Sequence, residues 1–209
     1  PLYLAVVVGL ALLLLLIAFR SLLVPLTAVG GFLLTIAASF GAMVAIFQDG
    51  FAASLFGVEA APVVSLLPIL VIGILFGLAM DYQVFLVSRM HEAHAHGMSA
   101  QDAIHDGFAH SARVVTAAGL IMISVFASFI LTPEPIVKSV GFALTFGIFV
   151  DAFLVRMTLI PALMSFMGRH AWYLPRWMER VVPDVDLEGR DLEREFAAKL
   201  ETEAVPATA

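Results

Sequence analysis

The sequence predicts an all-α fold, a polytopic membrane helix bundle, and three observations lead to that class. Hydrophobic residues make up 61% of the 209 residues, whereas charged residues make up only 13%. A soluble domain carries about 25% charged residues, so this chain has too few charges to cover a globular surface. The apolar residues also fall into five nearly uncharged runs, and a helix needs about 20 such residues to cross a bilayer. Cysteine is absent, which excludes a disulfide scaffold and a thiolate zinc site.

The five runs give the expected boundaries of the spans, because each is limited by a charge or a proline. The first run stops at Arg20, and the second begins near Pro25, a residue that the first turn of a helix tolerates. The third contains Asp81 and ends before Arg89. We expect spans at about residues 2–19, 24–47, 63–88, 114–131 and 136–167, which together form a transmembrane bundle over residues 1–168.

Prolines and one capping pattern refine the later elements. Pro68 and Pro161 predict bends in the third and fifth spans. In the connection before the fourth span, Ser99 and Asp102 match a capping box, in which a side chain caps the first turn of a helix. We therefore expect a short amphipathic helix at the membrane surface, separate from the fourth span that begins after Arg113.

The arginines predict the orientation, because cytoplasmic connections carry an excess of Lys and Arg. They fall in alternate connections, whereas the opposite connections carry almost none, with Lys138 as the exception. This places Pro1 outside and the C-terminus in the cytoplasm, in a multi-pass protein of the cytoplasmic (inner) membrane. An apolar run that starts at residue 1 without a charged region is not a signal peptide, so we expect a fragment of a longer protein. The arginines concerned are Arg20, Arg89, Arg113, Arg169, Arg176 and Arg180.

The C-terminal part divides into two segments. Residues 169–183 interleave Trp172, Tyr173 and Trp177 with arginines, which is typical of an interfacial anchor. Residues 184–209 hold eight acidic and three basic residues, a net charge of −5 out of −6 for the chain, and we expect an acidic cytoplasmic tail. Upstream of this tail the charges nearly balance, so nothing indicates a nucleic-acid surface.

Asp81 and Tyr82 carry the sharpest functional signal. Asp81 lies eight residues before Arg89, about 12 Å along a helix, and so inside the hydrocarbon. A carboxylate there costs about 2.5 to 3.5 kcal/mol and typically serves an ion or proton pathway, in which the Tyr82 hydroxyl can donate or accept. Gly73 and Gly77 continue the same face at intervals of four residues and predict a close helix contact. The alternative is a purely structural, hydrogen-bonded Asp81.

Asp151 and Arg156 form a second candidate set in the fifth span. Five residues correspond to about 140° around a straight α-helix, so the two side chains should not meet as an i to i+4 pair. We expect Asp151 to face the bundle interior and Arg156 to extend towards the cytoplasmic interface. A role in coupling and a role as an ordinary orientation anchor both fit Arg156.

Other polar clusters indicate no further chemistry. A solvated loop is favoured over a metal site for the histidine-rich connection, since it offers no rigid frame. Ser124 and Ser128 are four residues apart and are interpreted as helix-packing hydroxyls. A Gly-x-Ser-x-Gly pattern and an intramembrane histidine are both absent, so we expect no enzyme. The residues of the connection are His91, Glu92, His94 and His96.

Three stretches, taken in order, resemble the MMPL (mycobacterial membrane protein large) family of the RND transporter superfamily. They run from Gly77 to Arg89, from Arg113 to Gly119 and from Asp151 to Met164. The resemblance extends over nearly the whole chain up to Gly168. Members of the family have two repeats of six helices, each with a large extracytoplasmic domain after its first helix. The resemblance therefore implies that this chain is the last five helices of an RND-type second repeat.

The resemblance also implies a function, a proton-motive-force-driven exporter of lipids or other hydrophobic molecules. Asp81 and Tyr82 match the Asp-Tyr pair of the second repeat, which relays protons, and Asp151 and Arg156 match the acidic and basic positions of the last helix. Protons are then the coupling ion, with no cofactor and no metal. The implied partners are membrane lipids, a hydrophobic substrate and the missing N-terminal repeat, and an oligomer is left open. A non-transporting scaffold or sterol-sensing-like module is the alternative.

Overall fold

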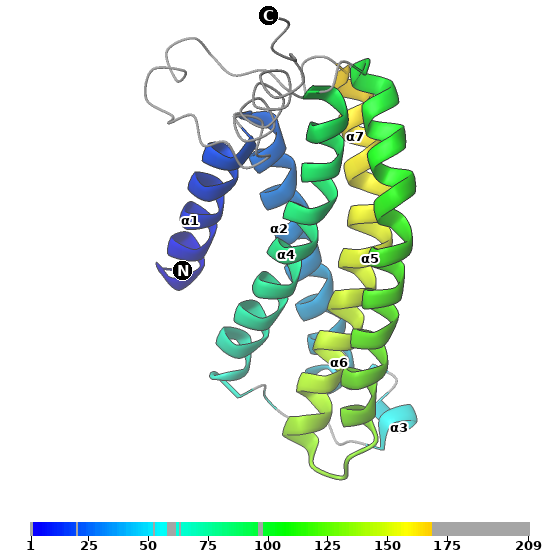
Figure 1. The fold of residues 1–209 in the computed structure, drawn as a ribbon. Coiled ribbons are helices and arrows are strands. Elements are labelled where there is room, and N and C mark those ends of the chain that lie inside the picture. The colour runs from blue at the N-terminus through cyan, green and yellow to red at the C-terminus, as the bar shows by residue number, and fades with distance from the viewer. Residues whose placement is uncertain are drawn as a thin grey trace, which may run out of the picture.

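The computed structural model describes residues 2–19, 21–51, 53–57, 62, 64–95 and 98–168. Within these ranges the regular structure is entirely helical, and five helical stretches are long and apolar enough to cross a membrane. Successive stretches run in alternate directions and pack side by side (Figure 1). The predicted all-α, multi-pass bundle is therefore confirmed. The anchor expected at 169–183 and the tail expected at 184–209 lie outside the described residues.

The first two stretches begin and end within one residue of the expected bounds. Helix α1 spans Leu2–Phe19 and α2 spans Leu23–Met43, and a π-helical segment, η1 (Val44–Gln48), completes the second stretch. Pro25 is the third residue of α2, in the first turn, where its missing N–H has no partner to lose. A single short helix, α3 (Ala53–Phe56), follows at the far end of the bundle (Figure 1).

Helix α4 spans Leu67–Ala95, so it begins later and ends later than the predicted 63–88. Pro68 is consequently its second residue, a position at which proline breaks no bond within the helix. The bend was expected at Pro68 because the helix was predicted to begin at residue 63. A proline in the first turn gives no cause for a bend. At the other end, the helix was expected to stop before Arg89 but continues to Ala95. Met90 is fully buried there, so packing stabilises this last part of the helix.

Helix α5 spans Ala100–Ile130 and corrects a second prediction. The expected cap is confirmed, since Ser99 Oγ accepts the backbone N–H of Asp102 at 3.2 Å. The expected separation into an interfacial helix and a span is wrong, because nothing breaks the helix between them and helices propagate cooperatively. At 31 residues α5 is about 46 Å long, longer than a hydrocarbon core of about 30 Å, so its polar first turns extend beyond it.

The last stretch is continuous over Pro135–Met167 but changes helix type twice. It consists of α6 (Pro135–Phe149), the π-helix η2 (Val150–Leu159) and α7 (Ile160–Met167). Pro161 is the second residue of α7, so the place expected to bend coincides with the end of the π-helix. A proline cannot donate to a preceding carbonyl, which is consistent with a change of helix type at this point.

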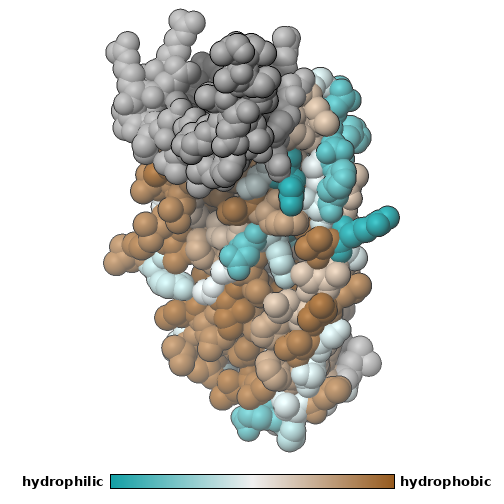
Figure 2. Space-filling model, in the orientation of Figure 1, coloured by the Kyte–Doolittle hydropathy of each residue, from teal (hydrophilic) through white to brown (hydrophobic). Residues whose placement is uncertain are grey.

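Two clusters of buried apolar side chains hold the bundle together, one in each half. Small residues let the helices approach, since a Cβ built on Gly31 of α2 would overlap Val155 Cγ1 of η2. Large apolar side chains such as Leu14 and Ile121 remain exposed, and apolar side chains cover most of the described surface in Figure 2. That distribution suits a lipid-facing exterior. The clusters include Leu15, Phe19, Leu86, Met90 and Met164 in one half, and Phe32, Met43, Leu75, Leu144 and Ile148 in the other.

Candidate functional site

A buried ion pair in the last span corrects the prediction made for Asp151 and Arg156. Arg156 Nε donates to Asp151 Oδ2 at 2.6 Å, and the two residues are only 3% and 5% exposed. The expectation that they face different partners, with Arg156 near the interface, was wrong. It assumed an α-helix, whereas both residues lie in η2. A π-helix closes its turns from i to i+5, so a spacing of five residues places two side chains together.

Neighbouring spans supply the remaining hydrogen bonds of this pair. Arg156 Nη1 donates to Gln83 Oε1 of α4 at 3.2 Å, and Nη2 donates to the backbone carbonyl of Ala79. On the other side, Thr35 Oγ1 of α2 donates to Asp151 Oδ1 at 3.3 Å. Buried charges are tolerated only when such bonds satisfy them. The result is a polar network that joins α2, α4 and η2.

The network lies deep in the bundle. Gln83 is about 7 Å along the axis from the middle of the apolar stretch Leu67–Met90, well within the hydrocarbon half-thickness of about 15 Å. Its side chain is buried, and its Nε2 has no hydrogen-bond partner among the described residues. The amide orientation follows from chemistry, since the guanidinium can only donate and Oε1 must therefore face it.

Tyr82 connects the buried network to the outer face of α4. It is half-buried, and Arg156 Cζ lies 5.9 Å from the centre of its ring, within the range of a cation–π interaction. In the chain it directly follows Asp81, whose side chain is exposed. The predicted pair is thus divided: Tyr82 contacts the buried arginine, and Asp81 lies on the surface of these five helices.

The glycines predicted to make a close helix contact behave differently from each other. A Cβ built on Gly73 would lie 2.9 Å from the hydroxyl of Tyr3, so α1 approaches α4 there. A Cβ built on Gly77 would meet no atom within 4 Å of the described chain. Gly77 and Asp81 therefore form an open, small-residue face at mid-membrane depth, with an acid at its centre.

Gln83 and Thr35 are site residues that the sequence reasoning missed. Gln83 carried a usable signal, because an amide in an apolar span is costly for the same reason that singled out Asp81. Thr35 carried none, since a threonine in a membrane helix commonly bonds to the backbone of its own helix. Only the tertiary structure directs its hydroxyl to Asp151.

The remaining candidates do not join this site. Ser124 and Ser128 are exposed on α5 and donate to carbonyls of their own helix, at 2.8 and 2.6 Å, so they contact no other helix among the described residues, and their interpretation as packing hydroxyls stays a prediction. The side chains of His91, Glu92 and His94, and all of His96, lie outside the described residues. In the part of the chain that is described, no group of three metal-ligating side chains comes together.

Comparison with known proteins gives one consistent result. The sequence model of the MMPL family matches residues 2–185. Membrane protein YdfJ of Bacillus subtilis is 53% identical over 204 residues, which are 97% of this chain and 28% of that protein. Heme uptake protein MmpL11 of Mycobacterium tuberculosis is 40% identical over 188 residues, 90% of this chain and 20% of that protein. Trehalose monomycolate exporter MmpL3 of Mycolicibacterium smegmatis is 36% identical over 176 residues, 84% of this chain and 17% of that protein. The chain spans less than a third of the length of each relative.

Proposed function

The chain belongs to the MMPL family, and from this premise we propose that it is the C-terminal transmembrane part of a proton-motive-force-driven exporter of lipids or other hydrophobic molecules. In this proposal Asp81 and Tyr82 relay protons, and Asp151 with Arg156 couples them to the bundle. The observation that carries the proposal is an acid, Asp81, on an open face at mid-membrane depth, next to a tyrosine in contact with a buried ion pair.

Proton binding at Asp81 changes the charge of this open face. The ionised carboxylate costs about 2.5 to 3.5 kcal/mol at the centre of a bilayer, and the neutral acid avoids that cost. A difference of this size shifts a two-state equilibrium about 100-fold, so the two forms favour different contacts between α4 and whatever packs on it. We propose the N-terminal repeat of the same protein as the partner that packs there.

The buried pair supplies a fixed frame for this exchange. Arg156 bonds to α4 through Gln83 and Ala79, and through Asp151 it is tied to α2. A shift of Tyr82 on α4 therefore disturbs contacts to two other spans. This arrangement supports a role for Asp151 and Arg156 in coupling, with protons as the only ion that the proposal requires.

The relatives support the proposed class of substrate. MmpL3 of Mycolicibacterium smegmatis is named for trehalose monomycolate and MmpL11 of Mycobacterium tuberculosis for heme, and both molecules have large hydrophobic parts. We propose a lipid or another hydrophobic molecule as the cargo of the whole protein, and membrane lipids as its surroundings. We further propose the cytoplasmic membrane as its location and a cytoplasmic C-terminus, with transport and no enzymatic reaction.

A transport assay with the full-length protein in proteoliposomes tests the proposal. Asp81→Asn keeps the size and the hydrogen bonding of the side chain but removes its titration, so proton-coupled transport should fall at least about 100-fold. The matched control is Asp49→Asn, which neutralises an exposed acid in a connection and should transport normally. Undiminished transport by Asp81→Asn would reject the relay. A wild-type protein that transports none of the lipids offered, with or without a proton gradient, would favour the scaffold.

A further inference from the structure

Gln83 is a buried amide of which only one end is bonded. Its side chain is 1% exposed, and Oε1 accepts Arg156 Nη1 at 3.2 Å, whereas Nε2 has no hydrogen-bond partner among the described residues. A polar group in an apolar span costs stability, and a bond left unmade adds to that cost. Residues that break a stability rule in this way are expected at functional sites. The bonded end, the amide oxygen, is therefore the part to which a role can be assigned.

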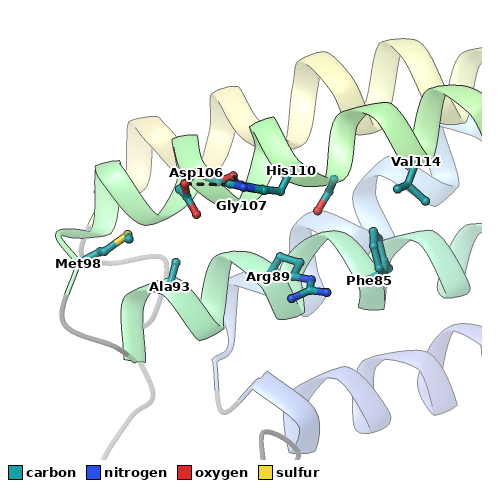
Figure 3. Close-up of a pocket in the computed structure, with 9 residues that line it drawn as sticks. Phe85, Arg89, Ala93, Met98, Asp106, Gly107, His110 and Val114 are labelled. Carbon is teal, nitrogen blue, oxygen red and sulfur yellow. Dashed lines mark hydrogen bonds and ion pairs between the residues drawn. The ribbon is translucent and has the colours of Figure 1, made fainter.

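The amide belongs to the interior of the bundle. Phe85 and Arg89 of the same helix point into a cavity of about 590 Å³ between α4 and α5 (Figure 3), and Gln83 does not line this cavity. Gln83 instead bonds to η2 through Arg156. The amide oxygen is thus part of the polar network and not of the cavity.

Three acceptors hold the guanidinium of Arg156. Nε donates to Asp151 Oδ2 at 2.6 Å, Nη2 donates to the carbonyl of Ala79, and Nη1 donates to Gln83. Ala79 and Gln83 are four residues apart on α4, so their acceptors lie about one helical turn apart on the same side. A planar guanidinium that is bonded through all three nitrogens cannot turn freely. Its orientation is therefore set jointly by Asp151 and by α4.

This orientation brings the guanidinium to Tyr82. Arg156 Cζ lies 5.9 Å from the centre of the tyrosine ring, near the limit of about 6 Å for a cation–π interaction. At this distance a small displacement ends the contact. Without the bond to Gln83, the guanidinium keeps its ion pair with Asp151 but can turn away from the ring. The amide oxygen of Gln83 therefore acts on Tyr82 through Arg156.

We propose that Gln83 is a positioning residue, whose amide oxygen holds Arg156 against the ring of Tyr82. The inference rests on the proposed proton relay, in which Tyr82 acts together with Asp81. A ring held in one orientation keeps its hydroxyl in one place, as a relay requires. The acceptor of Gln83 is the part that is needed, and its donor is dispensable.

Infrared spectroscopy of the full-length protein in lipid tests the position of Arg156 without transport. Subtracting the spectrum of the matching Tyr82→Phe protein isolates the tyrosine ring band of Tyr82. Gln83→Leu has no acceptor and should shift this band. Gln83→Glu has the same length and keeps an oxygen acceptor while it loses the donor, so it should shift the band less than half as far.

Transport is the second readout, with fluorescently labelled phosphatidylethanolamine as the cargo in proteoliposomes that carry a proton gradient. Gln83→Leu should transport about tenfold more slowly than the wild type, and Gln83→Glu should stay within about threefold of it. The control Gln101→Leu removes an exposed amide of α5 and should match the wild type in both readouts. Thermal melting in detergent, measured for every variant, checks that each one is folded.

Three results would overturn the inference: an unshifted Tyr82 band in Gln83→Leu, a Gln83→Glu protein that behaves like Gln83→Leu, or normal transport by Gln83→Leu while Asp81→Asn is inactive. Failure of the proposed function gives a different pattern. In that case Asp81→Asn transports normally, or the wild type does not transport the lipid, and the Tyr82 band alone then decides whether Gln83 positions Arg156.

Discussion

Three consecutive polar residues on α4 face three different environments. Asp81 is exposed, Tyr82 is half-buried against Arg156, and Gln83 is buried and bonded to the same arginine. Successive residues of an α-helix point about 100° apart, so one turn can present an acid outward and an amide inward. In the function that we propose, the outward acid exchanges protons, and the inward Gln83 is bonded to Arg156 of the buried ion pair.

The buried pair predicts a large loss of stability when one partner is removed. Asp151→Asn leaves an uncompensated guanidinium, and Arg156→Gln leaves an uncompensated carboxylate, and each should lower the free energy of unfolding by about 3 to 5 kcal/mol. Thermal and denaturant melting of the full-length protein in detergent measures this. Asp49→Asn serves as the control and should melt like the wild type, since that side chain is exposed. The double variant should lose clearly less than the sum of the two losses. Additive losses would mean that the two side chains do not interact.

At the scale of the elements, composition determined the spans and backbone register determined the site. The first two spans were predictable to within a residue, because an apolar run inside a membrane has to form a helix that satisfies its own backbone hydrogen bonds. The π-helix η2 was not predictable, because no apolar period in the sequence marks a turn closed from i to i+5. Asp151 and Arg156 were therefore named as a candidate set from the sequence, but the expectation that they point to different partners was wrong. The sequence reasoning took Arg113 as a boundary and so separated an interfacial helix from the fourth span. In the structure α5 continues through Arg113 without a break.

The contact between α4 and α5 predicts that Gly107 cannot be enlarged. Gly107→Ala places a methyl group within 2.8 Å of backbone atoms of Met90, so one helix must move. Overpacking of this kind typically costs about 1 to 3 kcal/mol, and the melting temperature should fall. The control is Gly41→Ala, where nothing lies within 4 Å and alanine is the better helix former, so stability should rise by about 0.5 to 1 kcal/mol. Equal melting of the two variants would contradict the close contact.

For the whole molecule, the alternating spans group the connections into two sets. The ends of α1, α4 and α7 lie at one end of the bundle, and the start of α4 and the end of α5 lie at the other (Figure 1). Along the sequence, Arg20 follows α1, Arg89 lies near the end of α4 and Arg169 follows α7, so we expect the first set on the cytoplasmic side. The open face of Gly77 and Asp81 lies on the outside of these five helices. The partner of that face therefore belongs to the rest of the protein or to the lipid.

The orientation predicts the outcome of reporter fusions in the full-length protein. A reporter that is active only in the cytoplasm should be active after His96 and after Ala209, and inactive when inserted at Ala53. The complementary external reporter should give the opposite pattern, which also controls for expression. A cytoplasmic signal at Ala53 would overturn the orientation while leaving the bundle itself unaffected.

We propose that Asp81 gains and loses a proton, whereas Asp151 stays bonded to Arg156 and Thr35. Infrared difference spectroscopy of the full-length protein in lipid, recorded on acidification from neutral pH, tests this most directly. Protonation of a carboxylate produces a carboxylic acid C=O band, and because this chain alone has 17 acidic residues, each variant is compared with the wild type by subtracting their spectra. Asp81→Asn should lose one component of the band, and Asp151→Asn should keep that component, provided that both variants are folded. A band that is unchanged in Asp81→Asn and loses a component in Asp151→Asn would contradict this proposal and assign the proton to the buried pair.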